Sequence, residues 1–474
     1  MLFAATHLIP YPSWLVPGDN TWQLVSATLV GLMSIPALAV LYGGLVQKKW
    51  IVNTMFMVFA GFSLTLIVWM VFGYSAAFGP QVSTYTSFFG TFKGWFHGIF
   101  GAGQHALFSA HAEQSQAQSG ALLSGLQFHF PTATLAYFQF VFAAITPLLF
   151  LGGLVGRIKF KAWLLIVPLW ITFVYCINAA LLWGGGWLAQ KGAVDYSGGY
   201  VIHLSAGVAS FVGAAMIGPR LKRDRTTVPS NLMMVAIGAG ILWLGWNGFN
   251  GGDPFYAGAD AASAVLNTNV ATATGVLTWV LMDMLFTKQK KPTFLGAING
   301  MLCGLVAITP SAGWVDGFGA ILVGLIASSF VWVAWNFLSK VRPFSKVDDA
   351  LGVVYTHGFA GLIGGLLVGL LADPSMTQYG VSGGHFGGAG SFSVGGLFYT
   401  GSWHQLEWQA IAAAWIIGFT AVATFLIFSF VKIVMRGLRE TDAVLEIGDL
   451  AIHDEEAFPT ETFSERITSL SAKN

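Results

Sequence analysis

The sequence predicts an all-α polytopic membrane protein with eleven transmembrane helices, from its composition, its apolar stretches and an internal repeat. Of 474 residues, 55% are hydrophobic and 9% are charged, whereas a soluble domain carries about 25% charged residues. Cys176 and Cys303 both lie in apolar runs, so no disulfide framework is indicated. A formal net charge of +1 favours no nucleic acid or other strongly charged partner, which leaves the lipid bilayer as the main surroundings.

A membrane-spanning helix needs roughly 20 mostly apolar residues, and eleven stretches of the chain meet this requirement. The eighth is short and rich in glycine. We expect a transmembrane domain over residues 1–436 and a cytoplasmic regulatory tail over 437–474. The eleven stretches are 22–45, 51–79, 132–153, 162–189, 198–218, 231–252, 262–286, 294–310, 316–339, 351–373 and 408–435.

Lys and Arg residues are distributed unequally between the two sides of these helices. Of 22 such residues, 20 lie in one alternate set of connections or at and beyond the end of the eleventh helix, and only Lys93 and Lys191 lie in the other set. Basic residues accumulate in cytoplasmic connections. We therefore expect a multi-pass protein of the cell membrane (plasma or inner membrane), with its N-terminus outside and its C-terminus in the cytoplasm.

Two segments five spans apart share the pattern Asp-x7-His-x2-Ala-Gly. The first places Asp195 and His203, and the second places Asp349 and His357. A repeat of five spans has odd length, so the second copy crosses the membrane in the opposite direction, as in transporters built from inverted repeats. The sequence therefore predicts two inverted five-helix repeats and a C-terminal helix, over about 22–219, 231–373 and 408–436.

Each histidine lies eight residues after its aspartate, which is about 12 Å along a helix. Entering from opposite faces of a core about 30 Å thick, the two imidazoles are expected to meet near its middle. The alternative is that each bonds only the backbone of a neighbouring helix. A matched pair favours a pathway, because ionisable groups inside membranes are costly. Two neutral imidazoles suit a small, neutral, hydrogen-bonding molecule or a proton relay. An Ile-Thr-Pro triplet also recurs, at 145–147 and 308–310.

Two further segments carry local patterns. Asp253-Pro254 has the pattern of a helix N-cap followed by proline at the first helical position, and capping is the favoured interpretation. The segment 80–131 is expected to be a solvated loop, and no metal is expected there. The spacing of its histidines matches no compact metal site; they are His97, His105, His111 and His129.

Motifs along most of the chain resemble those of the ammonium transporters of the Amt/Mep/Rh group, in its Amt/Mep branch. They follow one another in order over about 40–375, and related motifs continue into the tail. They are LYGGLVQKK, FAAIT, GRIKF, WGGGWLAQKGAVDYSGGYVIH, GWNGFNGGDPF, AVLNTN, GLVAITPSAGWVD and VDDALGVVYTHG, then GLRE and IGDLAIHDEEAF in the tail.

The resemblance implies a homotrimer with one ammonium pore in each subunit, no cofactor and no enzymatic chemistry. Trp183 and Phe142 would form an outer ammonium-binding site through cation–π contact. Trp246 would line the vestibule, where a lone tryptophan would otherwise belong to the aromatic belt at the headgroups. Phe142 and Phe249 would form a gate below the site.

The resemblance also assigns the repeated polar residues. His203 and His357 would be the paired pore histidines, which NH3 passes after NH4+ has lost its proton, with the proton following a separate path in some members. Asp195 would be the family's essential acid. Its position before a span favours a structural, capping role, and Asp349 would be its counterpart on the inner side.

Three positions depart from the family's pattern. Gly156 stands where many members have Glu, Asp253 where many have Ser, and Asp454 where the tail motif usually has Gly. An acid at position 253 would attract a cation, which is the alternative to capping. The resemblance further implies a PII-type signalling partner at the inner mouth and transport of methylammonium. An ammonium sensor and an Rh-like channel for NH3 or CO2 are the alternative functions, and Trp183 favours a charged substrate.

Overall fold

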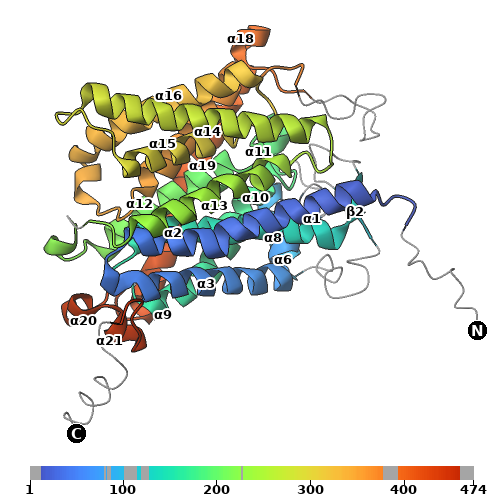
Figure 1. The fold of residues 1–474 in the computed structure, drawn as a ribbon. Coiled ribbons are helices and arrows are strands. Elements are labelled where there is room, and N and C mark those ends of the chain that lie inside the picture. Colours follow the sequence, from blue (N-terminus) through green and yellow to red (C-terminus); the bar gives the residue numbers. More distant parts are fainter. Residues whose placement is uncertain are drawn as a thin grey trace, which may run out of the picture.

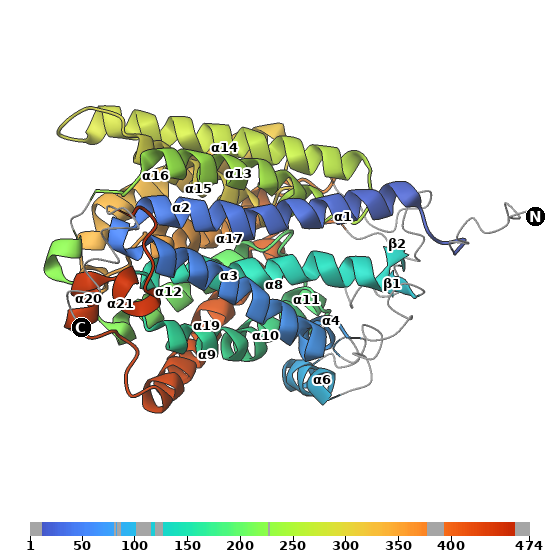
Figure 2. The same cartoon turned by 60° about the horizontal axis from the view of Figure 1, so that its bottom comes forward.

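The computed structural model describes residues 12–79, 82, 87–100, 115–118, 127–225, 228–376 and 393–459. Within these residues, ten helices are long and apolar enough to cross a membrane, and Phe294–Ile308 forms a shorter apolar helix. The helices run side by side in one bundle (Figures 1 and 2). The predicted all-α membrane fold is therefore confirmed, with the eighth span the shortest.

The spans in chain order have the following elements. They are α1 (Pro17–Leu32), η2 (Met33–Ala37) and α2 (Leu38–Leu45); η3 (Lys48–Trp50), α3 (Ile51–Val68), η4 (Trp69–Gly73) and α4 (Tyr74–Phe78); α8 (Thr132–Leu154); α9 (Phe160–Trp170), η7 (Ile171–Tyr175), α10 (Cys176–Leu182) and α11 (Trp187–Gln190); η8 (Gly199–Leu204) and α12 (Ser205–Ile217); α13 (Leu232–Gly251); α14 (Ala259–Phe286); α15 (Phe294–Ile308); α16 (Gly317–Asn336); η12 (Val354–Phe359) and α17 (Ala360–Leu371); and α19 (His404–Val434).

Shorter elements lie between and after the spans. They are α6 (Phe88–Phe100), β1 (Gln116–Gln118), β2 (Gln127–Pro131), η9 (Lys222–Arg225), η10 (Leu338–Lys340), η11 (Phe344–Lys346), α18 (Leu397–Thr400), α20 (Asp442–Ile447) and α21 (Asp449–His453).

Local sequence explains several ends and interruptions of these helices. The side chains of Asn231, Thr293 and Asp316 accept backbone N–H groups at the starts of α13, α15 and α16, which is the usual action of an N-cap. Pro36 lies within the π-helical turn η2, and Pro168 lies shortly before the π-helical turn η7. Proline has no N–H to donate, so the helical ladder is rearranged at these points.

The centre of the bundle is helix α8, in which every residue from Phe138 to Leu154 is buried. Around it, glycines allow backbones to approach closely, as is common where helices pack inside a membrane. A Cβ placed on Gly275 of α14 would lie 2.5 Å from the carbonyl oxygen of Gly300 on α15. The absence of a side chain at Gly275 therefore lets the eighth span pack closely against the seventh.

The two ends of the bundle carry different structures. Helix α1 begins at the end that we call the N-terminal face, and α20 and α21 lie at the opposite end, the tail face (Figure 1). Strands β1 and β2 pair antiparallel on the N-terminal face, with Gln116 opposite Pro131. The prediction of a solvated loop over 80–131 is wrong for residues 88–100, which form helix α6 packed on the bundle.

Of the four histidines in that segment, His105 and His111 lie outside the described residues. His97 is on α6, and His129 on β2 contacts the carboxylate of Asp19 at 3.0 Å. Among the described residues no three His, Cys, Asp or Glu side chains gather as a metal-binding group.

On the tail face, α21 is docked against the start of the second span. The Asp449 carboxylate accepts the backbone N–H groups of Val52 and Asn53 at 2.8 and 2.9 Å, so it caps α3 from a distant part of the chain. Asp454, at the end of α21, has φ +56°. Glycine adopts such a left-handed conformation readily and aspartate tolerates it, which explains this departure from the usual glycine. The remainder of the tail, 460–474, lies outside the described residues.

Candidate functional site

The two repeated histidines meet inside the bundle. Their Nδ1 atoms are 3.2 Å apart, and the ring centroids are 5.3 Å apart with 27° between the ring planes. Because one of two such nitrogen atoms must carry the proton for a hydrogen bond to form, the pair is one donor and one acceptor. The predicted convergence of His203 and His357 is confirmed, and the alternative that each bonds only a neighbour's backbone is wrong.

Both histidines lie on π-helical turns, which the repeat pattern did not reveal. His203 is in η8 and His357 is in η12, and each turn continues into a regular α-helix. Such turns occur frequently at functional sites. Nε2 of His203 is buried and has no hydrogen-bond partner among the described residues, so this nitrogen is available to a molecule in the pore.

Glycines let the two histidine helices cross at close range. A Cβ on Gly207 would lie 2.2 Å from Cα of Gly358, and a Cβ on Gly361 would lie 2.5 Å from the carbonyl oxygen of Gly199. Neither contact tolerates a side chain without movement of the backbone. The Ala-Gly that ends each copy of the repeat therefore brings the imidazoles within bonding distance.

The repeated aspartates hold the starts of these helices. Asp195 accepts the backbone N–H groups of Gly198, Tyr200 and Val201 at 3.1, 2.9 and 2.9 Å. Burial raises the pKa of Asp195 to about 6, although the backbone N–H groups act in the opposite direction. Since the carboxylate is an acceptor only, the ionised form suits this position best.

Asp349 occupies the matching position at the tail-face end of the second copy. It accepts the N–H groups of Val353 and Val354 at 3.2 and 2.8 Å and the hydroxyl of Ser210 at 3.2 Å. Burial raises its pKa to about 6 as well. Ser210 lies on α12, so this contact also joins the two histidine helices.

Aromatic rings form a continuous row from the N-terminal face to the histidines. Trp183 meets Phe142 edge-on at 6.2 Å, and Phe142 meets Phe249 at 4.4 Å with 34° between planes. Phe249 then stacks on His203 at 5.8 Å. The indole N–H of Trp183 donates to the backbone carbonyl of Asp195 at 2.7 Å, which fixes the ring at the mouth of the row.

Trp246 lies deeper than the vestibule position that the resemblance implied. Its ring stacks on His203 at 5.2 Å with 19° between planes, and it is fully buried. Its indole N–H donates to the hydroxyl of Thr309 at 2.9 Å. Thr309 belongs to the repeated Ile-Thr-Pro triplet, a sequence signal that was present but had been given no role.

Asp253 does not cap a helix, so the favoured sequence interpretation is wrong. The turn after α13 continues past Pro254, and α14 begins at Ala259 after Gly258. The Asp253 side chain is buried, and its Oδ2 has no hydrogen-bond partner among the described residues. Burial raises its pKa well above the usual range, the contact with Ser197 lowers it, and the nearby Asp195 raises it.

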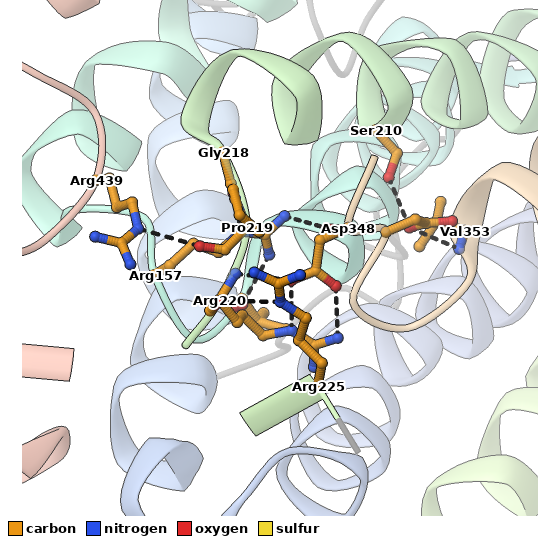
Figure 3. A network of polar contacts seen from close by, with 11 residues as sticks. Arg157, Ser210, Gly218, Pro219, Arg220, Arg225, Asp348, Val353 and Arg439 are labelled. Atoms are coloured by element: carbon orange, nitrogen blue, oxygen red, sulfur yellow. Dashed lines mark hydrogen bonds and ion pairs between the residues drawn. The ribbon is translucent and has the colours of Figure 1, made fainter. Parts of the chain in front are cut away.

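A cavity of about 300 Å³ extends from His357 to the tail face. Its lining is mostly apolar and includes Tyr42, Trp50, Trp335 and Thr356, with Arg220 near the tail face. The Arg220 guanidinium pairs with the Asp348 carboxylate through contacts of 2.7 and 3.0 Å (Figure 3). Although burial raises the pKa of Asp348, this pair lowers it to about 2, so the carboxylate stays ionised.

Arg157 is buried beside this pair and contacts backbone carbonyls. It donates to Gly218, Val155 and Asp348 at 2.8, 3.1 and 2.5 Å (Figure 3). Gly156, which precedes it, has φ +75°, a conformation that favours glycine. The carbonyl groups and the Asp348 charge thus surround the guanidinium where many family members place a glutamate.

This geometry suits the passage of a small, neutral, hydrogen-bonding molecule. Buried aromatic rings lead to two imidazoles, and a largely apolar cavity leads away from them. Asp195, Asp349 and Asp348 place their carboxylates at the ends of this route as helix caps or in an ion pair. Asp253 lies near Asp195, with its Oδ2 unbonded among the described residues.

Known proteins share this arrangement. Residues 21–458 match the model of the Ammonium Transporter Family. The chain is 43% identical over 453 residues to ammonium transporter 3 member 2 of Oryza sativa subsp. japonica, covering 94% of this chain and 90% of the relative. It is 41% identical over 451 residues to ammonium transporter 2 of Arabidopsis thaliana, covering 94% and 89%.

A solved structure agrees with these sequence relatives. The crystal structure of Mep2 from Saccharomyces cerevisiae superposes with a TM-score of 0.76 at 26% identity, covering 95% of this chain and 90% of that one. The structural match extends over most of both chains, and the family match over residues 21–458 includes both histidines. The chain belongs to the ammonium transporter family.

Proposed function

We propose that this protein takes up ammonium across a cell membrane, with the N-terminal face outside and the tail face in the cytoplasm. The observation that carries the proposal is the pair of bonded imidazoles at the end of a buried aromatic row. The distribution of Lys and Arg supports the orientation. Trp183 and Phe142 form the entrance of the route, and the tail-face cavity forms its exit.

Recruitment of NH4+ occurs at Trp183 and Phe142, whose perpendicular rings present a face and an edge to the mouth. Cation–π contacts are worth about 0.5–2 kcal/mol, which is enough to concentrate the ion without trapping it. Asp253 adds a carboxylate oxygen that no described group occupies. We assign this oxygen to the ammonium ion.

Loss of a proton then allows passage through the gate formed by Phe142 and Phe249, which stack too closely for a hydrated ion. K⁺ and Na⁺ cannot become neutral in this way, so the apolar route excludes them. NH3 hydrogen-bonds His203 and His357 and leaves by the tail-face cavity. The bonded histidine nitrogens offer a separate passage for the released proton, which makes net transport electrogenic.

Membership of the ammonium transporter family supports a proposal for the assembly and partners. We propose a homotrimer with one pore in each subunit, and a PII-type protein that binds the cytoplasmic mouth. The docked helices α20 and α21, held through Asp449 at the start of α3, would lie beside such a partner.

Proteoliposomes containing the protein and an internal pH dye test the transport step. An ammonium pulse is expected to give an inward current without alkalinisation of the interior, and a K⁺ pulse is expected to give no current. Alkalinisation without current would contradict the separate passage of the proton. Neither signal, with protein correctly inserted, would contradict ammonium transport itself.

A further inference from the structure

Helix α6 turns three of its phenylalanines away from the protein, while Phe92 and Trp95 pack inward. The exposed fractions of Phe89, Phe96 and Phe100 are 80%, 55% and 76%. These residues and Lys93 follow one another at intervals of four, three and four, so they form a single stripe along the helix. The opposite face, which packs on the bundle, holds the small buried residues Gly90, Thr91, Gly94 and Gly98.

A helix facing water keeps its large apolar side chains on the inward face, whereas α6 carries three of them on its outward face as well. Three phenylalanines on one stripe form an apolar patch of the kind that marks a membrane or protein contact. The helix makes backbone hydrogen bonds within itself over thirteen residues, as a segment in hydrocarbon must. Lys93 is the charged member of the stripe, and a long lysine side chain can extend its charge to the headgroups.

The neighbours of α6 show its depth. Phe92 packs on Phe419 at 6.1 Å, and Phe419 is the sixteenth residue of the 31-residue helix α19. The indole N–H of Trp95 donates to the carbonyl of Thr172 at 3.1 Å, and the Trp95 ring packs on Phe173 at 5.8 Å. Thr172 and Phe173 lie near the middle of the span Phe160–Gln190.

Phe92 and Trp95 therefore lie beside the middle of two spans, and the helix lies at the edge of the bundle (Figure 2). Phe173 is itself 44% exposed on the same side. Its side of the bundle also carries the exposed apolar residues of α19, among them Val422 and Phe425, which in a membrane-spanning helix face lipid. These lipid-facing residues identify acyl chains as what covers the stripe.

We propose that α6 is a membrane-embedded helix whose Phe89–Phe96–Phe100 stripe is covered by the acyl chains of the leaflet on the N-terminal face. Its inner face also reaches the mouth of the pore. The Thr91 hydroxyl accepts the backbone N–H of Trp187 at 3.0 Å, and Phe88 meets the Trp187 ring at 5.7 Å. Trp187 lies four residues after Trp183, so the embedded helix supports the loop that leaves the Trp183 site.

Spin labels on single cysteines test the surroundings of the stripe. Phe89→Cys and Phe96→Cys would be labelled in the full chain, reconstituted in lipid vesicles, and compared for collision with oxygen and with a water-soluble nickel chelate. Val422→Cys on the exposed face of α19 and Gln289→Cys in an exposed connection serve as references for lipid and water. Both α6 labels are expected to match the Val422 label, with oxygen collision several-fold above that of the chelate.

Two results would overturn the proposal. Chelate collision equal to that at position 289 would place the stripe in water. Low collision with both reagents, together with an immobilised spectrum, would place it against another protein surface such as a second copy of the chain. Thr91→Val provides an independent check of the inner face, since it removes the acceptor of the Trp187 N–H while leaving the stripe unchanged. It is expected to raise the ammonium concentration for half-maximal uptake and to leave both label spectra as they are.

Discussion

The indole N–H of Trp183 donates to the backbone carbonyl of Asp195 at 2.7 Å, while the carboxylate of the same aspartate holds the start of the helix that carries His203. One residue thus fixes both the aromatic mouth of the pore and the first of its two imidazoles. The position of Asp195 in the family is explained by this double role, without direct contact with the transported ion.

The raised pKa of Asp195 predicts a pH dependence. Its carboxyl has a pKa of about 6 in the folded chain, so between pH 7 and pH 5 it gains a proton and loses acceptor capacity for three N–H groups. Uptake is expected to fall as pH decreases through about 6, although ammonium itself stays protonated over this range. Initial uptake rates in vesicles of fixed internal pH measure this, and a flat profile would contradict it.

The raised pKa of Asp195 affects stability in the opposite direction: uptake falls as pH decreases, whereas the stability contribution rises. Because the folded-state pKa lies above the usual aspartate value of 3.8, the folded chain binds this proton more tightly than the unfolded chain does. The contribution of Asp195 to the free energy of unfolding is therefore largest below about pH 4 and decreases as pH rises to about 6. The ionised carboxylate holds the start of the His203 helix, and its ionisation lowers the free energy of unfolding.

Gly207→Ala is predicted to separate the histidines. The added methyl group would lie 2.2 Å from Cα of Gly358, and relieving such an overlap costs about 1–3 kcal/mol. We expect uptake to fall by about tenfold with the protein still inserted in the membrane. Gly240→Ala is the matched control, because a Cβ there meets nothing within 4 Å. Equal uptake by the two variants would show that the close crossing is dispensable.

Thr309→Val is predicted to disturb Trp246. It leaves the buried indole N–H without its acceptor, at a cost of about 1–3 kcal/mol. Since Trp246 stacks on His203, we expect a lower maximal uptake rate with little change in half-saturation. Thr309→Ser keeps the hydroxyl and should retain the rate. Equal maximal uptake rates for Thr309→Val and Thr309→Ser would show that the hydrogen bond from Trp246 does not affect transport.

Asp253→Asn is predicted to weaken recruitment of the cation. It keeps the size of the side chain and removes its ability to ionise. The half-saturating ammonium concentration should rise about tenfold, equivalent to 1.4 kcal/mol, with the maximal rate nearly preserved. Asp253→Ser introduces the residue that the family pattern has at this position. Its half-saturating concentration should lie between those of the unmodified chain and of Asp253→Asn. An unchanged half-saturation in both variants would remove Asp253 from the binding site.

The sequence was sufficient for the parts of the pore that depend on helix geometry. The spacing of Asp195 and His203, and of Asp349 and His357, predicts convergence because helix rise and membrane thickness set the depth of each imidazole. The π-helical turns were not predictable, since the wider turn depends on contacts between the two copies, including Gly361 with Gly199.

Local sequence patterns gave wrong predictions at Asp253-Pro254 and at helix α6, where contacts with the rest of the protein or with lipid determine the structure. Asp253-Pro254 reads as a cap, but the α13–α14 turn extends to Gly258. Helix α6 was missed because it lies in a long connection rich in polar residues. Its signal was the alternation of phenylalanine and glycine at helical spacing, which carries meaning only once the surroundings of the helix are known to be lipid.

The central claim is that His203 and His357 together form the passage between the aromatic row and the tail-face cavity. Uptake of labelled methylammonium by vesicles carrying the His203→Leu/His357→Leu double variant tests it most directly, at equal amounts of inserted protein. We predict a loss of at least about tenfold in the maximal rate, or about 1.4 kcal/mol of barrier, with binding at Trp183 retained. Uptake equal to that of the unmodified chain would contradict the account.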